Sequence, residues 1–381
     1  MRDAVIVEIA RTPVGRRNGS LSEVHPADLS ATVLNAVVER SGVDPALVDD
    51  VVWGCVSQVG EQASNIGRTA VLAAGWPETV PATTVDRQCG SSQQALHFAA
   101  AGVVAGHYDI AVAGGVEAMT RVPMGSTVEP GPGFPMPESV HERYGVRFNQ
   151  GIGAEMIAKK WGISRQQADE YALESHERAA AAIDAGAFDS QVVPVDIAGG
   201  VFSQDEGVRR GSTLEKLAEL KPAFDEDGLI TAANSSQISD GAGAMLVMSS
   251  EKAAELGLTP LVRVHTSVVV GSDPVMMLTG PIPATAKALA KSGLGIGDIG
   301  AFEVNEAFAP IPLAWLAETG ADVKVTNPLG GAIALGHPLG GSGAVLMARL
   351  VNHMRDNGVR YGLQTMCEGG GQANATIVEL L

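Results

Sequence analysis

The sequence predicts an α/β protein made of two similar halves, with an irregular segment inserted into the chain. Three observations lead to this prediction. Runs rich in β-branched residues alternate with helical stretches over residues 1–118. The alternation of strands and helices breaks off near Thr120. Two helices that are apolar nearly all round occupy corresponding places in the two parts of the chain. With 381 residues, of which 45% are hydrophobic, the chain can bury large cores.

The first half is expected to comprise residues 1–118, completed by residues 239–260. Its expected strands are Ala4–Ile9, Asp50–Cys55, Ala82–Val85 and Asp109–Ala113, and its expected helices are Pro26–Arg40, Asn65–Ala74 and Ser91–Ala105. Strands and helices in alternation are typical of βαβ units with a largely parallel sheet.

An irregular segment is expected over residues 119–238, because five prolines and several glycines fall between Pro123 and Pro137. Helices are then predicted at Gly151–Trp161 and Ser164–Ala185, the second opening with a Ser164…Gln167 capping box. Regular alternation resumes near Gly243–Met248, and residues 261–381 form the expected second half.

The two halves share a weak repeat. The apolar helices Ser91–Ala105 and Gly343–Asn352 each follow a turn and each precede a strand that ends in glycines, Asp109–Ala113 in one case and Tyr361–Cys367 in the other. A helix that is apolar on every face has to be buried on every face, so these two are expected to pack between the sheets of the halves. The alternative is that the repeat is a chance similarity of the kind that any α/β protein can show.

Composition excludes several classes of protein. A formal net charge of −17 disfavours binding to nucleic acid or to an anionic membrane. Three cysteines without a CxxC pair argue against a disulfide framework and against a metal site. Charged residues interrupt the first fifteen positions, so no signal peptide is predicted and the expected location is the cytoplasm.

Cys89 is the first candidate for chemistry. It lies in the segment Asp86–Ser92, at the expected start of an apolar helix, where backbone N–H groups and the helix dipole favour a thiolate. The alternative is inert packing, which is the interpretation given to Cys55.

Three later segments also carry reactive side chains. His337 lies in the glycine-rich run Gly330–Pro338, Cys367 precedes glycines whose N–H groups could form an oxyanion hole, and Asn305 and Glu306 stand where a strand meets a helix. Taken singly, the alternatives are a structural histidine and an ordinary helix cap.

Together these segments resemble the thiolase family of acetyl-CoA acyltransferases over essentially the whole chain. The motifs, in family order, are Ala10–Gly15, Cys89-Gly90-Ser91, Asn305-Glu306-Ala307-Phe308, Gly336-His337-Pro338 and Cys367-Glu368-Gly369. The resemblance implies a five-layer α/β/α/β/α fold of two like halves, with an inserted loop domain over 119–238 that covers the coenzyme A and acyl pocket.

The resemblance also implies catalytic roles. Cys89 would be the acylated nucleophile and His337 its base, while His337 and a water on Asn305 would hold the first oxyanion. Cys367 would act as acid and then as base. The backbone N–H groups of Cys89 and Gly369 would hold the second oxyanion, and Glu306 would orient its neighbours.

Coenzyme A is implied as a co-substrate, with no permanently bound cofactor. By resemblance Arg209 meets the nucleotide end, Ser236 contacts pantetheine and Phe224 lines the tunnel, with Ala307 and Phe308 as further contacts. The alternative for Arg209 is a solvated face. A homodimer or homotetramer is also implied.

The sequence departs from short-chain members of the family. Asn149-Gln150-Gly151 stands in place of their usual His-Met-Gly, and Glu368 occupies a position that is usually small or apolar. The segments Asp86–Ala95 and Tyr361–Gly370 most resemble those of degradative thiolases of actinobacterial steroid and ring breakdown. Apolar residues in the proline-rich stretch are expected to line a wider acyl pocket or, alternatively, a subunit interface: Met124, Phe134 and Met136.

The predicted function is thiolytic cleavage of a 3-oxoacyl-CoA, with a medium, branched or ring-derived acyl group preferred over acetoacetyl-CoA. An acetoacetyl-CoA thiolase working in the condensing direction is the first alternative. A ketoacyl synthase and a non-catalytic lipid-CoA binding module are further alternatives, and the Cys-x-Gly at Cys367 argues against the synthase.

Overall fold

The computed structural model describes residues 2–128 and 133–381. Its strands are β1 (Val5–Arg11), β2 (Gly15–Arg16), β3 (Asp50–Gly54), β4 (Ala82–Val85), β5 (Ile110–Ala118), β6 (Val195–Ile197), β7 (Gly200–Phe202), β8 (Ser239–Met248), β9 (Val262–Gly271), β10 (Ala301–Val304), β11 (Tyr361–Glu368) and β12 (Gln372–Leu380). Its α-helices are α1 (Pro26–Ser41), α2 (Ile66–Ala73), α3 (Ser91–Val104), α4 (Glu138–Tyr144), α5 (Gln150–Trp161), α6 (Arg165–Asp184), α7 (Leu214–Ala218), α8 (Ser250–Glu255), α9 (Pro281–Ser292), α10 (Pro310–Thr319), α11 (Ala332–Leu335) and α12 (Ser342–Asn357). In the part of the chain so described, no helix is long and apolar enough to cross a membrane.

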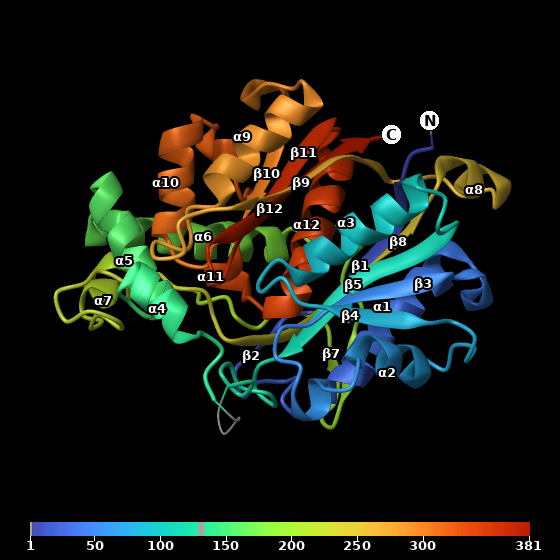
Figure 1. Ribbon diagram of the computed structural model, residues 1–381, viewed down its shortest axis with the longest axis horizontal. Coiled ribbons are helices and arrows are strands. Elements are labelled where there is room, and N and C mark those ends of the chain that lie inside the picture. The colour runs from blue at the N-terminus through green and yellow to red at the C-terminus, as the bar shows by residue number, and fades with distance from the viewer. Residues whose placement is uncertain (1, 129–132) are drawn as a thin grey trace.

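The strands form one large mixed sheet in the order β10-β11-β12-β9-β1-β8-β5-β3-β4, with β2 beside β8. The strands from β1 to β4 in this order belong to the first half, and those from β10 to β9 belong to the second. A short antiparallel contact joins the two, with Val5 opposite Arg263 and Ile6 opposite Val262. The sequence predicts two separate sheets, whereas the structure connects them along β1 and β9 (Figure 1).

Three hydrophobic cores separate five layers, which confirms the predicted fold class. The first core lies between α1, α2 and the outer face of β1, β3, β5 and β8. The second surrounds α3 and α12 between the halves, and the third lies between α9, α10 and the strands of the second half. In Figure 1, α3 and α12 lie between the α1–α2 layer and the α9–α10 layer.

One expectation about the central helices is wrong. Helix α12 is buried over its first eleven residues, but α3 leaves Phe98 49% and Val104 46% exposed. The apolar pattern of α3 therefore does not mean burial on every side within one chain. One face of the helix covers β3 and β5, and the opposite face is open.

A second difference concerns β5, which continues to Ala118 where the sequence predicts an end at Gly114-Gly115. These glycines are not a terminus but a place of close backbone contact. A side-chain carbon on Gly115 would meet the carbonyl oxygen of Gly54 at 2.6 Å and would collide with that of Gly340. The segment that precedes α12 therefore passes directly over β5.

The segment between β5 and β8 contains α4 to α7 and the β6–β7 hairpin. Its helix α6 opens with the predicted capping box, in which Ser164 and Gln167 bond reciprocally. The segment is tied to the first half by Arg11, whose guanidinium donates to both carboxylate oxygens of Asp205 at 2.7 and 2.8 Å and to Gln191 at 2.8 Å. Arg11 and Asp205 are both buried.

Candidate active site

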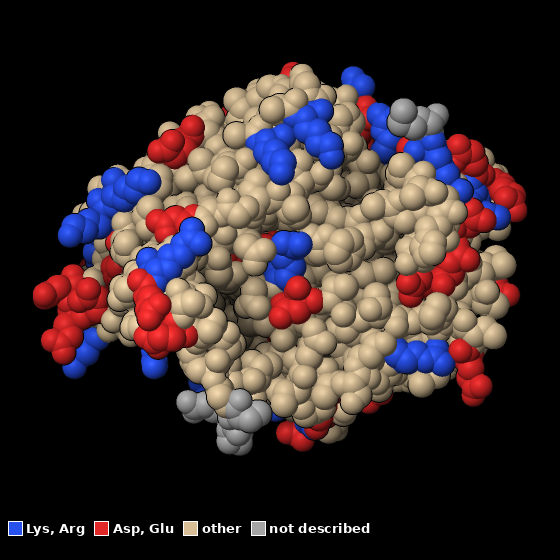
Figure 2. All heavy atoms as spheres, viewed as in Figure 1, with Lys and Arg blue, Asp and Glu red and all other residues tan. Residues whose placement is uncertain are grey.

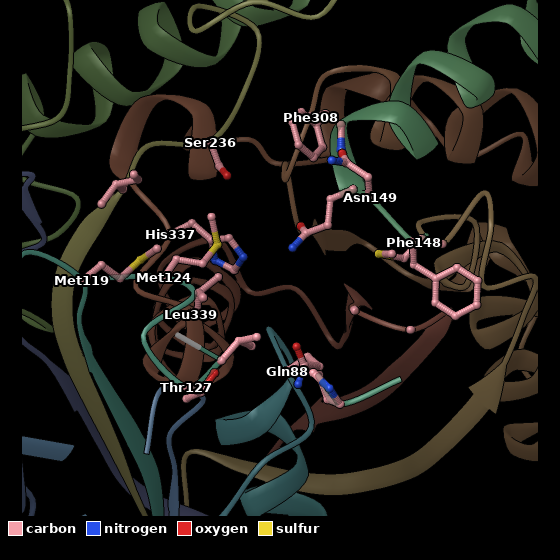
Figure 3. Close-up of a pocket in the computed structure, with 18 of the residues that line it drawn as sticks. Gln88, Met119, Met124, Thr127, Phe148, Asn149, Ser236, Phe308, His337 and Leu339 are labelled. Atoms are coloured by element: carbon pink, nitrogen blue, oxygen red, sulfur yellow. The ribbon is translucent and has the colours of Figure 1, made fainter. Parts of the chain in front are cut away.

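The predicted reactive segments meet at a cavity of about 1090 Å³. Its walls come from both halves and from the segment between β5 and β8. The lining residues that the sequence predicts for the site are His337, Gly369, Phe224, Ser236, Phe308, Asn149 and Gln150. Figure 3 shows His337, Asn149 and Gln88 bordering this cavity from different sides.

Cys89 lies just before α3, beneath the cavity floor. The preceding Gln88 has φ +48°, a left-handed turn that presents the cysteine at the helix start. The thiol is buried and packs with Met119, Leu339 and Met366. Burial raises the pKa of the Cys89 thiol well above its usual value, and the nearby Cys367 and Glu368 add to this effect. The expectation that the helix start favours a thiolate is therefore wrong for the resting protein, and this thiol needs a base.

His337 has the properties of that base. Burial lowers its pKa to about 4, so the imidazole is neutral at physiological pH. Ser342 donates its hydroxyl proton to the carbonyl of Pro338 at 2.8 Å, so its oxygen accepts from Nδ1–H of His337 at 2.6 Å. This network assigns the proton to Nδ1 and leaves Nε2 as the unprotonated, acceptor nitrogen. The backbone N–H of His337 donates to Ser239 Oγ at 3.0 Å.

Asn305 contacts the same imidazole, with its Nδ2 3.4 Å from Nε2 of His337. Its Oδ1 is buried and has no hydrogen-bond partner among the described residues. A buried acceptor of this kind is costly unless a ligand or water satisfies it. Asn305 is thus suited to hold a water or a substrate group beside His337.

Glu306 does orient its neighbours. It is buried and accepts from Tyr171 Oη at 2.9 Å, Ser175 Oγ at 2.7 Å and Asn327 Nδ2 at 3.0 Å. It also accepts from the backbone N–H of Ile333 at 3.2 Å. Ile333 belongs to the segment that leads to His337. One carboxylate therefore ties the Asn305 loop to α6 and to α11.

Cys367 lies near the end of β11, opposite Ala373 of β12. It is fully buried, and burial raises its pKa to about 12, so the group is a thiol at neutral pH. The turn that follows runs through Gly369 to Gly371, with φ +81° at Gly370 and +76° at Gly371. Gly369 and Gly370 face the cavity.

The structure places some of the predicted coenzyme A contacts at the cavity and leaves Arg209 away from it. Phe224 and Phe308 pack edge to face on the cavity wall with ring centroids 5.8 Å apart, and Ser236 N–H donates to the carbonyl of Ala307 at 2.9 Å. Arg209 is exposed and does not line the cavity; its backbone N–H donates to His176 Nδ1 at 3.1 Å. The structure therefore does not join Arg209 to this group.

One side of the cavity has an apolar wall. Met124, Phe134 and Met136 all line it, together with Phe148 and Met277. The structure places the first three residues on the cavity wall in the single chain; that this wall belongs to an acyl pocket stays a prediction. Part of the Pro123–Pro137 stretch, residues 129–132, lies outside the described residues. Asn149 caps α5, because its Oδ1 accepts from the N–H groups of Gly151 and Ile152.

Sequence reasoning missed several residues around the reactive groups. Ser342 and Ser239 hold His337, and Gln88 lines the cavity beside Gly369. Glu117, buried beneath the floor, accepts from the backbone N–H groups of Ser57 and Gly340 at 3.0 and 2.8 Å. Only Ser342 had a sequence signal, since it begins the small-residue helix five positions after His337.

Comparison with known proteins decides the family. The family model of the thiolase N-terminal domain matches residues 4–251, and that of the thiolase C-terminal domain matches residues 258–380. This chain belongs to the thiolase family. It is accordingly an acyltransferase, as the motifs predict.

Relatives of this thiolase match it from end to end. It is 50% identical to the steroid 3-ketoacyl-CoA thiolase FadA6 of Mycobacterium tuberculosis, over 100% of this chain and 95% of that protein. It is 46% identical to a 3-ketoacyl-CoA thiolase of Photobacterium profundum over the full length of both. Its fold matches the crystal structure of the acetyl-CoA acetyltransferase of Bacillus anthracis with a TM-score of 0.92 and 39% identity, covering 100% and 99% of the two chains.

Proposed function

We propose that this thiolase cleaves a 3-oxoacyl-CoA with coenzyme A, yielding acetyl-CoA and a shortened acyl-CoA through an acyl-cysteine at Cys89. The observation that carries the proposal is the neutral His337, with Nε2 unprotonated, beside a cavity under which Cys89 and Cys367 are buried. Full-length relatives named 3-ketoacyl-CoA thiolase support the substrate class.

The first half-reaction begins when Nε2 of His337 takes the Cys89 proton. The thiolate attacks C3 of the substrate, and the oxyanion is held by His337 and by a water on Asn305, whose Oδ1 lacks a protein partner among the described residues. The C2–C3 bond then breaks, and the departing acetyl-CoA carbanion takes a proton from Cys367. The raised pKa of Cys367, about 12, suits this role because the group starts protonated.

In the second half-reaction, Cys367 takes the proton of incoming coenzyme A and so regains its own. The coenzyme thiolate attacks the acyl carbon on Cys89, and the oxyanion is held by the N–H groups of Cys89 and Gly369. The C–S bond to Cys89 breaks, His337 returns its proton to the released Cys89 thiolate, and the acyl-CoA leaves. Each cysteine thus returns to its starting state.

The proposed cover of the site is the segment 119–238, between a first half of 1–118 with 239–260 and a second half of 261–381. It contributes Phe224, Ser236, Asn149 and Gln150 to the cavity wall, along with the Met124 region. We propose that coenzyme A enters beneath this segment as a co-substrate and that no cofactor stays bound.

The apolar wall supports a larger acyl group than acetoacetyl. Met124, Phe134 and Met136 bring flexible thioethers and a ring to the cavity, and each added methylene in such a pocket contributes ~1–3 kcal/mol to discrimination. We therefore propose medium, branched or ring-derived 3-oxoacyl-CoA substrates. The name of the Mycobacterium tuberculosis relative, a steroid thiolase, agrees with this size class.

Two measurements test the proposal. Mixing the enzyme with a 3-oxoacyl-CoA, without free coenzyme A, should add one shortened acyl mass to the Cys89 peptide, and a Cys89→Ser variant is the control. Acylation confined to Cys55 or Cys367 would contradict it. In a thiolysis panel of graded chain length, the highest kcat/KM with acetoacetyl-CoA would indicate a short-chain acetyltransferase instead.

A homodimer is part of the proposal. Strand β4 is an edge strand that pairs with β3, and the open face of α3 carries the exposed Phe98 and Val104. Figure 2 shows that the face with α3 and β4 is largely uncharged, with charged side chains toward its margins and a basic and an acidic group side by side near the centre of the view. A second copy would cover these apolar side chains, and sedimentation of the purified chain tests this, with Phe98→Glu expected to favour the monomer.

A further inference from the structure

Glu368 is a buried carboxyl that no protein group satisfies. It is the last residue of β11 and has no exposed surface, and neither of its carboxylate oxygens has a hydrogen-bond partner among the described residues. An ionised carboxylate in such a place is strongly unfavourable, because burial removes its hydration without replacing it. Burial raises the pKa of Glu368 to about 8, so the carboxyl is mostly uncharged at neutral pH.

The carboxyl lies beside both reactive cysteines. It directly follows Cys367 in the chain, and its Oε1 packs against Gly90, the residue after Cys89. A side-chain carbon at Gly90 would collide with this oxygen and would lie 2.7 Å from Nδ2 of Asn374. The Asn374 amide donates to the carbonyl of Gly90 at 3.0 Å, so β12 closes the same space from the other side.

Three elements surround Glu368, and two of them contribute charged or titratable groups. On the loop before α3, the Arg87 guanidinium lowers the pKa of Glu368 and the Asp86 carboxylate raises it, both less than burial does. The Cys89 and Cys367 thiols both have their pKa raised by Glu368. The nearby side chains of β12, Asn374 and Gln372, are uncharged.

We propose that Glu368 is a positioning residue that allows Cys89 to form its thiolate only while the Glu368 carboxyl carries its proton. The uncharged carboxyl leaves the start of α3 free to stabilise negative charge on Cys89. Once ionised, it places a second negative charge next to the thiolate and opposes it. Glu368 thereby limits the reaction at alkaline pH. This inference rests on the proposed role of Cys89 as the nucleophile.

The test is the rate at which iodoacetamide alkylates Cys89, followed by peptide mass spectrometry from pH 6.5 to 9.5 in wild type and Glu368→Gln. At pH 6.5 the rates should agree, because an amide and a protonated carboxyl are both uncharged. Above pH ~8 the variant should become faster, and a shift of one pKa unit corresponds to about tenfold in thiolate population. A ratio that stays constant over the whole range would overturn the proposal and would indicate a purely structural role.

The matched control is Asp86→Asn, which removes an exposed carboxylate from the same loop. Burial raises the pKa of Asp86, but its carboxylate accepts from the backbone N–H of Gln88 at 2.6 Å, which lowers it, so its removal should not reproduce the rise above pH ~8 that is expected of Glu368→Gln. Glu368→Leu is a second uncharged variant whose profile should follow that of Glu368→Gln, and it replaces that variant if Glu368→Gln does not fold. Alkylation needs no substrate, so a failure of thiolysis would count against the proposed function and leave this result interpretable.

Discussion

At the scale of single residues, the site depends on burial more than on intrinsic reactivity. Burial keeps both cysteines protonated and keeps His337 neutral, so each group begins in the form that its step requires. The unfolded chain would protonate His337 near pH 6.5, whereas the folded protein does so only near pH 4. The free energy of unfolding therefore decreases, on account of this group, as the pH falls from about 6.5 towards about 4.

The low pKa of His337 predicts the acid side of the pH profile. The base form of this residue persists until pH approaches about 4, so kcat/KM should not fall between pH 7 and pH 5.5 on account of His337. The measurement is kcat/KM for thiolysis in short assays after a pH jump, which limits unfolding. An inflection near 6.5 would mean that the imidazole is hydrated and accessible in solution.

Ser342→Ala should weaken the base without removing it. The variant loses the acceptor that holds Nδ1–H, so the favoured tautomer and ring orientation are no longer enforced. A hydrogen bond of this kind contributes about 1 kcal/mol, which corresponds to about a fivefold loss in the rate of Cys89 acylation. The rate of acyl-enzyme formation in single turnovers measures it, and Ser342→Thr, which keeps the hydroxyl, is the control.

The sequence identifies reactive residues better than it identifies their surroundings. Cys89 is recognisable because it stands at the start of an apolar helix, and His337 and Cys367 because each stands beside a run of glycines. The direction of the Cys89 pKa and the position of the His337 backbone depend on contacts between distant segments, such as Cys367 and Glu368 with Cys89 and Ser239 with His337. No local pattern encodes such contacts.

At the scale of elements, the observed strands and helices lie close to the bounds that the sequence predicts. The predictions are wrong where one element packs against another. Ala82–Val85 is predicted with its observed bounds, but the glycines of β5 were interpreted as a strand end because close backbone contact and chain termination both require glycine. The open face of α3 was missed for a related reason. An apolar surface has the same pattern whether its own chain or another chain covers it.

Gly343→Ala tests the contact between the two central helices. Alanine favours a helix by up to ~1 kcal/mol over glycine. A carbon at this position of α12 would nevertheless collide with the backbone nitrogen of Gln93 in α3. Overpacking should prevail and lower the free energy of unfolding by about 1–3 kcal/mol in denaturant titrations. Gly297→Ala, at an exposed site with open space around it, should change this value little.

At the scale of the whole molecule, the proposed function requires an acidic chain to admit an acidic ligand. The formal net charge is −17, and coenzyme A carries several negative charges of its own. Arg210 is already paired with Asp184 at 2.6 Å, whereas Arg209 makes no salt bridge in the described residues. Arg209 is thus the better candidate for a phosphate contact at the entrance.

Arg209→Ala should raise the KM for coenzyme A, with an effect that shrinks as salt is added, because exposed charges are screened within about 10 Å at 0.1 M. Steady-state thiolysis at low and high ionic strength measures it, and Arg210→Ala is the matched neighbour with a smaller expected effect. An unchanged KM at low ionic strength would remove Arg209 from the coenzyme site.

The order of strands in the sheet has a consequence for synthesis of the chain. The partner of β1 and β5 is β8, which lies more than a hundred residues after β5, and β1 also touches β9. A ribosome that adds ~5–20 residues per second must complete about two thirds of the chain before the first sheet can close. Until then the apolar faces of β1 and β5 emerge without their neighbour. The nascent chain therefore exposes these aggregation-prone apolar faces for many seconds. Its yield in the cell should depend on chaperones that bind during translation.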